Sequence, residues 1–179
     1  MNELSRPFSG GARHWCPCTA APASAARDAL LYRLLDDVSA PRGWLPASGG
    51  LLANLRVWEN VLLIAGFGMG APTQAELQRL CTLFAGFGEP APQLLLQARV
   101  DHLNRRQRAL VCAVRTLMSA PRLIVADSEW FSQFEDEMAD RLAQQFARYC
   151  PEAGWLVIGP ACPAAIWGAF AAIETEGIA

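Results

Sequence analysis

The sequence lacks an excess of charge of either sign. It carries 15 Lys plus Arg against 17 Asp plus Glu, which gives a net charge of -2 over 179 residues. Proteins that bind nucleic acid or an anionic membrane surface through charge alone need a clear basic excess. We therefore expect no nucleic-acid partner, and any binding surface must be local.

The sequence also lacks a secretory leader and an uninterrupted membrane span. Glu3 and Arg6 precede the polar region at His14, with no apolar core of leader length between them. Residues 154–173 are uncharged and long enough to cross a bilayer, but they contain Pro160, Pro163 and three glycines. This composition favours a buried strand, a turn and a short helix. We expect a cytoplasmic protein that does not itself span the membrane.

Residues that bind metals are scarce. There are two histidines, and four of the six cysteines lie in apolar stretches, where a thiol behaves as a small hydrophobe. The run Cys16-Pro17-Cys18 follows His14, but no second ligand pair with zinc-type spacing occurs elsewhere. We expect reduced thiols and no metal site.

What the sequence does contain is a series of amphipathic helices and short apolar strands. Its 53% hydrophobic content predicts one domain over residues 1–179, with a poorly defined segment at 1–20. Leu123–Ala126 and Trp155–Ile158 have the pattern of buried parallel strands, and short strands are expected near Trp15 and at 43–46. Asn54 is a candidate helix cap, and Thr73 with Glu76 predicts a capping box. Helices are expected at 27–38, within 51–66, and at 73–86, 93–99, 104–118 and 135–149. This alternation predicts an α/β fold with a largely parallel sheet.

Four segments resemble the ATP-binding subunits of ABC transporters, which belong to the P-loop NTPase superfamily. Leu103-Asn104-Arg105-Arg106-Gln107, followed by the strand that ends at Asp127, is similar to the signature and Walker B segments. Residues 49–61 are similar to the segment after the Q-loop, most closely in transporters of the MCE-linked lipid type. Residues 21–31 follow the outline of Walker A, and 156–160 follow the strand before the H-loop. The resemblance covers about residues 11–177. It implies a three-layer fold with a helical subdomain at 73–118, lacking most of the antiparallel β-subdomain.

The Walker A segment departs from the family in the residues that hold phosphate. A phosphate cradle needs glycines, whose backbone N–H groups converge on the phosphate, and a Lys that neutralises it. This chain has Ala21, Ser24 and Ala26 at the glycine positions, Arg27 for the Lys and Asp28 for the Mg²⁺-binding hydroxyl. An acidic side chain beside a triphosphate is repulsive.

The remaining family positions have also changed. Ala47 replaces the Q-loop Gln, Ser128 the catalytic Glu, and Pro160 the H-loop His. In the signature, Arg105 and Arg106 replace two glycines at a helix N-terminus, where the helix dipole disfavours cations. Asp127 alone is kept. We expect no catalytic residues and no resident cofactor, with ATP and Mg²⁺ at most weakly bound by a degenerate site of Ser24, Ala26, Arg27, Asp28 and Asp127.

The leading hypothesis is a non-hydrolysing docking or regulatory component of a membrane transporter. Its partners would be a transmembrane permease and a paired ATP-binding subunit, at the inner face of the cell membrane. The residues expected to dock are Leu51, Leu52, Asn54, Trp58, Glu59 and Asn60, and the signature-like residues are Asn104, Arg105, Arg106 and Gln107. The aromatic residues Trp58 and Trp130 are further candidates for an interface.

Two alternatives remain open. The first is a slow ATPase subunit that uses Asp127 and Glu129, with Arg27 in place of the Lys. The second is an interaction module whose basic patch binds an acidic partner, the patch consisting of Arg99, His102, Arg105, Arg106, Arg108 and Arg115.

Overall fold

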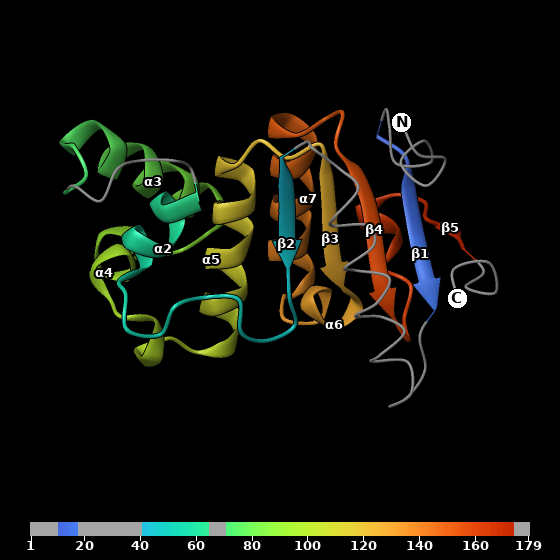
Figure 1. The fold of residues 1–179 in the computed structure, drawn as a ribbon, viewed down its shortest axis with the longest axis horizontal. Helices are drawn as coiled ribbons and strands as arrows, with labels where there is room; N and C mark the ends of the chain where they lie inside the picture. The colour runs from blue at the N-terminus through green and yellow to red at the C-terminus, as the bar shows by residue number, and fades with distance from the viewer. Residues whose placement is uncertain (1–10, 18–40, 65–70, 174–179) are drawn as a thin grey trace.

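The computed structural model describes residues 11–17, 41–64 and 71–173 (Figure 1). In these residues five strands form one sheet in the order β2-β3-β4-β1-β5, and neighbouring strands are parallel. The strands are β1 (Arg13–Pro17), β2 (Arg42–Leu45), β3 (Leu123–Asp127), β4 (Gly154–Gly159) and β5 (Ala171–Ala172). The predicted α/β fold with a parallel sheet is confirmed.

Helices precede and follow the central strands. They are α2 (Val57–Ile64), α3 (Gln74–Gly86), α4 (Pro92–Gln97), α5 (Arg105–Met118), α6 (Ser128–Phe131) and α7 (Asp136–Tyr149), with short 3₁₀ turns at Val100–His102 and Ala165–Trp167. Figure 1 shows α2, α3 and α4 grouped beside α5, away from the sheet. Within this group α2 packs against α4, and it also packs against α5.

Strands β3 and β4 alternate between two apolar faces. Ile124 and Ala126 face the larger core, whereas Leu123 and Val125 belong to a smaller cluster together with Cys16. Successive side chains on a strand point to opposite faces, so a strand that is apolar throughout is buried on both. This explains why these two strands were recognisable from sequence as unbroken apolar runs.

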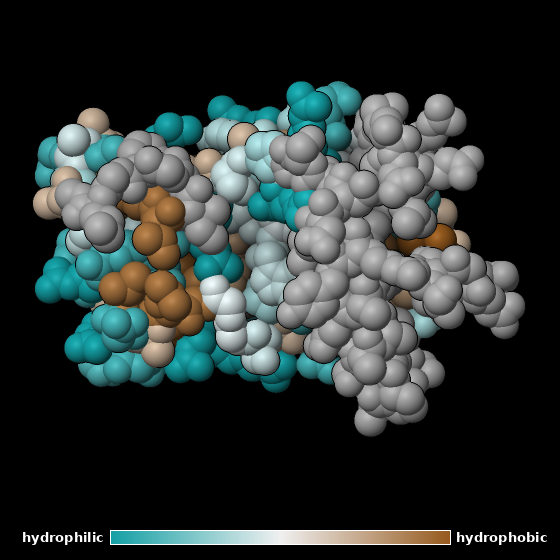
Figure 2. Space-filling view, viewed as in Figure 1, coloured by the Kyte–Doolittle hydropathy of each residue, from teal (hydrophilic) through white to brown (hydrophobic). Residues whose placement is uncertain are grey.

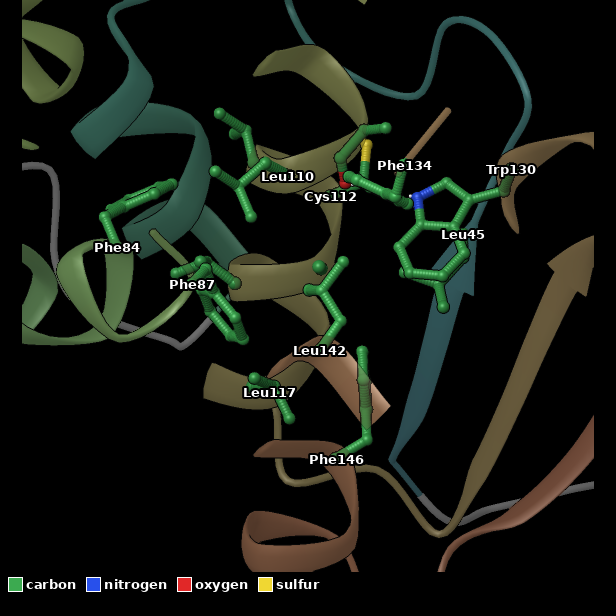
Figure 3. Close-up of a cluster of buried hydrophobic side chains, with 14 of the residues drawn as sticks. Leu45, Phe84, Phe87, Leu110, Cys112, Leu117, Trp130, Phe134, Leu142 and Phe146 are labelled. Atoms are coloured by element: carbon green, nitrogen blue, oxygen red, sulfur yellow. Dashed lines mark hydrogen bonds between the residues drawn. The ribbon is translucent and has the colours of Figure 1, made fainter. Parts of the chain in front are cut away.

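Helix α5 joins the sheet to the helical group (Figure 3). Residues 109–117 are all buried, so the helix is covered around most of its circumference. Phe84 and Phe87 of the helical group approach it on one side, and Trp130 and Phe134 approach it on the other. The two parts therefore share one hydrophobic core.

Several local predictions are confirmed and some are wrong. Thr73 accepts a hydrogen bond from the Glu76 N–H, and Glu76 bonds back to the Thr73 N–H, so the predicted capping box is present. Asn54 does not cap α2, because that helix begins at Val57 and the carboxylate of Glu59 accepts the N–H of Arg56 at 2.6 Å. The short helix α6 and strand β5 were not predicted, and the helix expected at 27–38 lies outside the described residues.

The uncharged stretch 154–173 forms β4, a turn, a 3₁₀ turn and β5, so the predicted strand and turn are present and the end of the stretch is a strand that was not predicted. Among the described helices, none has the length and apolar character that crossing a bilayer requires.

Candidate functional site

The candidate site lies at the carboxyl edge of the sheet, where β2, β3 and β4 end close together. In open parallel sheets this edge is where ligands bind. Parallel pairing sets Leu45 beside Ala126 and Asp127 beside Ile158. The residues that follow these strand ends, Ala47, Ser128 and Pro160, are therefore neighbours at one edge.

Asp127 is half-buried at the end of β3 and holds the loop that follows β2. Its Oδ2 accepts a hydrogen bond from the backbone N–H of Ala47, with an N···O distance of 2.9 Å. Ala47 contributes a methyl group to this edge where the family resemblance implies a Gln side chain. The interaction at this position thus involves the backbone of the loop, which sequence comparison does not reveal.

Ser128 is enclosed between β3 and β4. It is 8% exposed, and a Cβ placed on Gly159 would lie 2.1 Å from its Oγ. Gly159 has φ +145°, and its carbonyl accepts a hydrogen bond from the Trp15 indole N–H at 3.0 Å. The hydroxyl of Ser128 thus faces tightly packed backbone.

Pro160 follows Gly159 and is exposed. Its side chain has no hydrogen-bonding group, so it offers no ligand to a phosphate. The chain contains no lysine, since all 15 of its basic residues are arginines. Among the described residues at this edge, Asp127 is the strand-end side chain best suited to ligate Mg²⁺.

The signature-like residues form the beginning of α5. The Asn104 side chain accepts the Gln107 N–H at 2.8 Å, and the Gln107 side chain accepts the Asn104 N–H at 3.2 Å. These two residues form a capping box, which satisfies free N–H groups at the helix start. Arg105 and Arg106 between them are exposed, and Arg105 lies 3.7 Å from the Glu129 carboxylate. Both groups of that pair are largely exposed, so the pair adds little stability.

The segment expected to dock, residues 51–60, has an internal and an external part. Asn60 is 2% exposed, and its amide bonds to the N–H of Leu52 at 2.7 Å and to the carbonyls of Leu52 and Arg56 at 3.1 Å. It supports the segment from within and presents no surface. The Glu59 carboxylate accepts the Arg56 N–H at the start of α2. Of the other residues expected to dock, Leu51 and Trp58 are half-buried, and Leu52 and Asn54 are exposed.

An apolar surface lies over the helical group. Leu52, Leu63 and Leu94 are 51%, 50% and 76% exposed, and they come from the loop before α2, from α2 and from α4. Figure 2 shows hydrophobic surface gathered over the region that α2 and α4 occupy in Figure 1. Singly exposed apolar residues are ordinary, whereas contiguous apolar surface is typical of contact surfaces, which makes this face a candidate for one.

The structure corrects two expectations. Arg115 does not belong to a surface patch, because it is 8% exposed and its Nη1 donates to the carbonyl of Gly50. Its place within the apolar run 109–117 was the available signal. Trp130 is fully buried, and its indole N–H donates to the Ala109 carbonyl at 3.2 Å, so it does not form an exposed interface.

The buried cysteines have the character of core residues. Burial raises the pKa of Cys112 and of Cys150 to about 11, so both are neutral thiols near pH 7. The thiolate is the form that ligates metals and attacks electrophiles. In the described part of the chain, no group of three or more potential ligands is placed to hold a metal ion.

The Walker A-like residues Ser24, Ala26, Arg27 and Asp28 lie outside the described residues. The structure therefore brings together Asp127, Ala47, Ser128 and Pro160 at one edge, and it gives no geometry for the rest of the degenerate nucleotide site.

Comparison with protein-family profiles gave no match, and comparison with curated proteins gave none either. Solved structures do match. An ATP-binding subunit of an ABC transporter is 19% identical with a TM-score of 0.63, over 85% of this chain and 69% of that one. The dimeric, post-hydrolysis ATP-binding cassette MJ0796, bound to ADP and Pi, is 13% identical with a TM-score of 0.60, over 84% and 75%.

An ABC transporter in an inward-facing conformation is 16% identical with a TM-score of 0.57, and this chain spans 63% of its length. Sequences this different can share a fold without sharing an activity. The likeness therefore shows the fold alone, which is similar to that of the ATP-binding subunits of ABC transporters.

Proposed function

We propose that this chain is a non-hydrolysing subunit of an ABC-type transporter that works by docking. Its partners are a transmembrane permease and a paired ATP-binding subunit, at the inner face of the cell membrane. The sequence of residues 49–61 favours a transporter of the MCE-linked lipid type.

One observation carries the proposal: the retained Asp127 bonds to the loop that leads to the apolar surface, while the positions around it have no catalytic side chain. The Asp127 Oδ2 accepts the Ala47 N–H. Ser128 is too weak a base to replace a catalytic Glu, and it is packed against Gly159. Pro160 offers no imidazole. Glu129 points to Arg105 and is largely exposed.

The apolar surface supports docking as the activity that remains. Burying a fully exposed leucine side chain contributes about 1.5–3 kcal/mol, and because Leu52 and Leu94 are 51% and 76% exposed, each contributes a corresponding share of that value. Leu52 and Leu94 therefore make a contact of useful strength with an apolar helix of a permease, and the segment that carries Leu52 is held rigidly by Asn60.

The docking test is co-sedimentation with membrane vesicles prepared from the cells in which this chain is native. We expect Leu52→Asp and Leu94→Asp to weaken binding by about tenfold or more, because each removes apolar contact and adds a charge that the contact must desolvate. Ile166→Asp is the matched control, since Ile166 is 37% exposed on the 3₁₀ turn beyond β4. Equal binding by all three variants would overturn the docking surface.

The test of the missing activity is phosphate release from ATP with Mg²⁺, by the chain alone and with the vesicles. We expect no release above that of the vesicles. Turnover by the chain that Asp127→Ala abolishes would instead support the alternative of a slow ATPase.

A further inference from the structure

The loop between β2 and α2 has few backbone partners of its own and is held by polar side chains. Residues 46–56 form neither helix nor strand except for a bridge at Arg56. Backbone groups held away from water need partners, and four side chains from outside this loop bond to its backbone. They are Asp127 at the end of β3, Arg115 on α5, and Glu59 and Asn60 on α2.

Asp127 holds the first part of the loop. The hydrogen bond from Ala47 N–H to its Oδ2 is 2.9 Å long, is partly buried, and joins positions 80 residues apart. A hydrogen bond to an ionised carboxylate is about twice as strong as one between neutral groups. The bond fixes where the loop leaves the sheet.

Arg115 holds the middle of the loop. Its guanidinium donates to the Gly50 carbonyl and lies near the Cys112 sulfur, and no carboxylate pairs with it in the described part of the chain. Gly50 has φ +72°, and a Cβ there would lie 2.7 Å from the Pro46 side chain. Arg115 thus links α5 to the backbone in the middle of the loop.

Asn60 holds the last part, through its three bonds to Leu52 and Arg56. In addition to these bonds, backbone hydrogen bonds connect the end of the loop to the segment before α5. The Val57 N–H donates to the Ala98 carbonyl at 3.0 Å, and the Val100 N–H donates to the Leu55 carbonyl at 3.2 Å. Leu52 is thus an exposed apolar side chain on a backbone that is fixed at both ends.

We infer that Asp127 is a positioning residue, whose carboxylate presets the loop 46–56 and so keeps the docking surface formed without nucleotide. The identity of this surface as a docking surface rests on the proposed function. The Ala47 N–H bonds to the Asp127 Oδ2 within the chain itself, so the loop is expected to keep its position whether or not Mg²⁺ and nucleotide are present.

The experiment is amide hydrogen exchange over residues 46–56 in the full chain. We expect Asp127→Ala to speed exchange of the Ala47 amide about ten- to a hundredfold, as expected for the loss of a hydrogen bond to a charged group. The exchange rate of the Ala47 amide in Asp127→Asn should lie between the rates in the unaltered chain and in Asp127→Ala, because the Asn amide oxygen still accepts a hydrogen bond but carries no charge. Asp140→Asn on α7 is the matched control, since Asp140 is exposed, and it should leave Ala47 unchanged.

A second arm adds Mg²⁺ and ATP, each at a millimolar concentration, to the unaltered chain. We expect the Ala47 amide to keep its slow exchange. Unchanged exchange in Asp127→Ala, or acceleration of Ala47 by Mg²⁺ and ATP to the rate of that variant, would overturn the inference. Exchange of the β4 amides shows whether Asp127→Ala folds. If it does not fold, the Ala47 exchange rates in Asp127→Asn and in the unaltered chain with Mg²⁺ and ATP still test the inference.

These measurements use the chain alone, so they are independent of vesicle binding. Slow Ala47 exchange that depends on Asp127, together with no binding to vesicles, would keep the positioning role and reject the proposed docking. Docking that is lost in Leu52→Asp but unaffected by Asp127→Ala, with unchanged exchange, would keep the proposed function and reject the role of Asp127.

Discussion

Replacing Gly159 by Ala tests how tightly the ends of β3 and β4 are packed. Gly159 has φ +145°, a backbone conformation that residues with a Cβ rarely adopt. The added Cβ would lie 2.1 Å from the Ser128 Oγ and 2.9 Å from the Ser128 Cβ. Both separations are far below van der Waals contact, so either residue must move.

The expected loss of stability has two parts. Holding an alanine in this part of φ/ψ space costs about 1–3 kcal/mol. Overpacking against Ser128 costs about 1–3 kcal/mol more. We expect Gly159→Ala to lower the free energy of unfolding by about 2–6 kcal/mol, a large fraction of the stability of a typical domain.

The assay is urea unfolding followed by tryptophan fluorescence, with the slope m checked for constancy. Gly86→Ala is the control, since Gly86 lies at the end of α3 and a Cβ there would meet the Gln145 side chain at an ordinary 3.7 Å. We expect that control to be neutral or stabilising by about 0.5–1 kcal/mol.

A second substitution separates the two parts. Adding Ser128→Gly to Gly159→Ala removes the clash but not the backbone strain, so the pair should recover about 1–3 kcal/mol relative to the sum of the single changes. The reasoning is refuted if Gly159→Ala behaves like Gly86→Ala, or if the double variant shows no coupling.

Three further outcomes are expected. Trp130→Phe should lower the free energy of unfolding by about 1–3 kcal/mol, because it removes a buried hydrogen bond to α5 and leaves a cavity. Urea unfolding measures this loss, and an unchanged urea midpoint would contradict it. Thr73→Ala should cost about 1 kcal/mol through loss of a helix cap, measured by urea unfolding. The bonds to Thr73 lower the pKa of Glu76, so the part of this difference that depends on the Glu76 carboxylate is present above pH 4.5 and should be lost as the pH falls through that lowered value. The urea midpoints of the two proteins should therefore lie closer together in acid, and a constant difference would contradict this. With a thiol reagent near neutral pH, exposed Cys162 should react readily, whereas Cys112 should react only on unfolding. Mass spectrometry measures the two reaction rates, and equal rates for Cys162 and Cys112 would contradict the burial of Cys112.

The strands and most helices could be predicted because their signals are local. An unbroken apolar run such as Leu123–Ala126 predicts a strand buried on both faces, and the Thr73–Glu76 pair predicts a helix start. Asn54 was misassigned because the same side chain suits a cap and a turn. The actual start of α2 depends on Glu59, whose carboxylate bonds back to Arg56.

Residue type alone gave wrong predictions for two side chains whose role depends on burial. Arg115 was grouped with the surface arginines by its charge, although it lies in a buried helix and bonds to Gly50. Trp130 was a candidate for an interface because polar residues flank it in sequence. The packing of α6 between the sheet and α5 places it in the core, and α6 is too short to give a periodic signal.

The sequence by itself determined the α/β class, the parallel strands and the retention of Asp127, because periodicity and residue type report directly on local structure. Only the tertiary structure decided what Asp127 bonds to. The register that sets Leu45 beside Ala126 brings Ala47 to the end of β3. The partner there is a backbone N–H, which every residue except proline carries, so no side-chain pattern in the sequence distinguishes it.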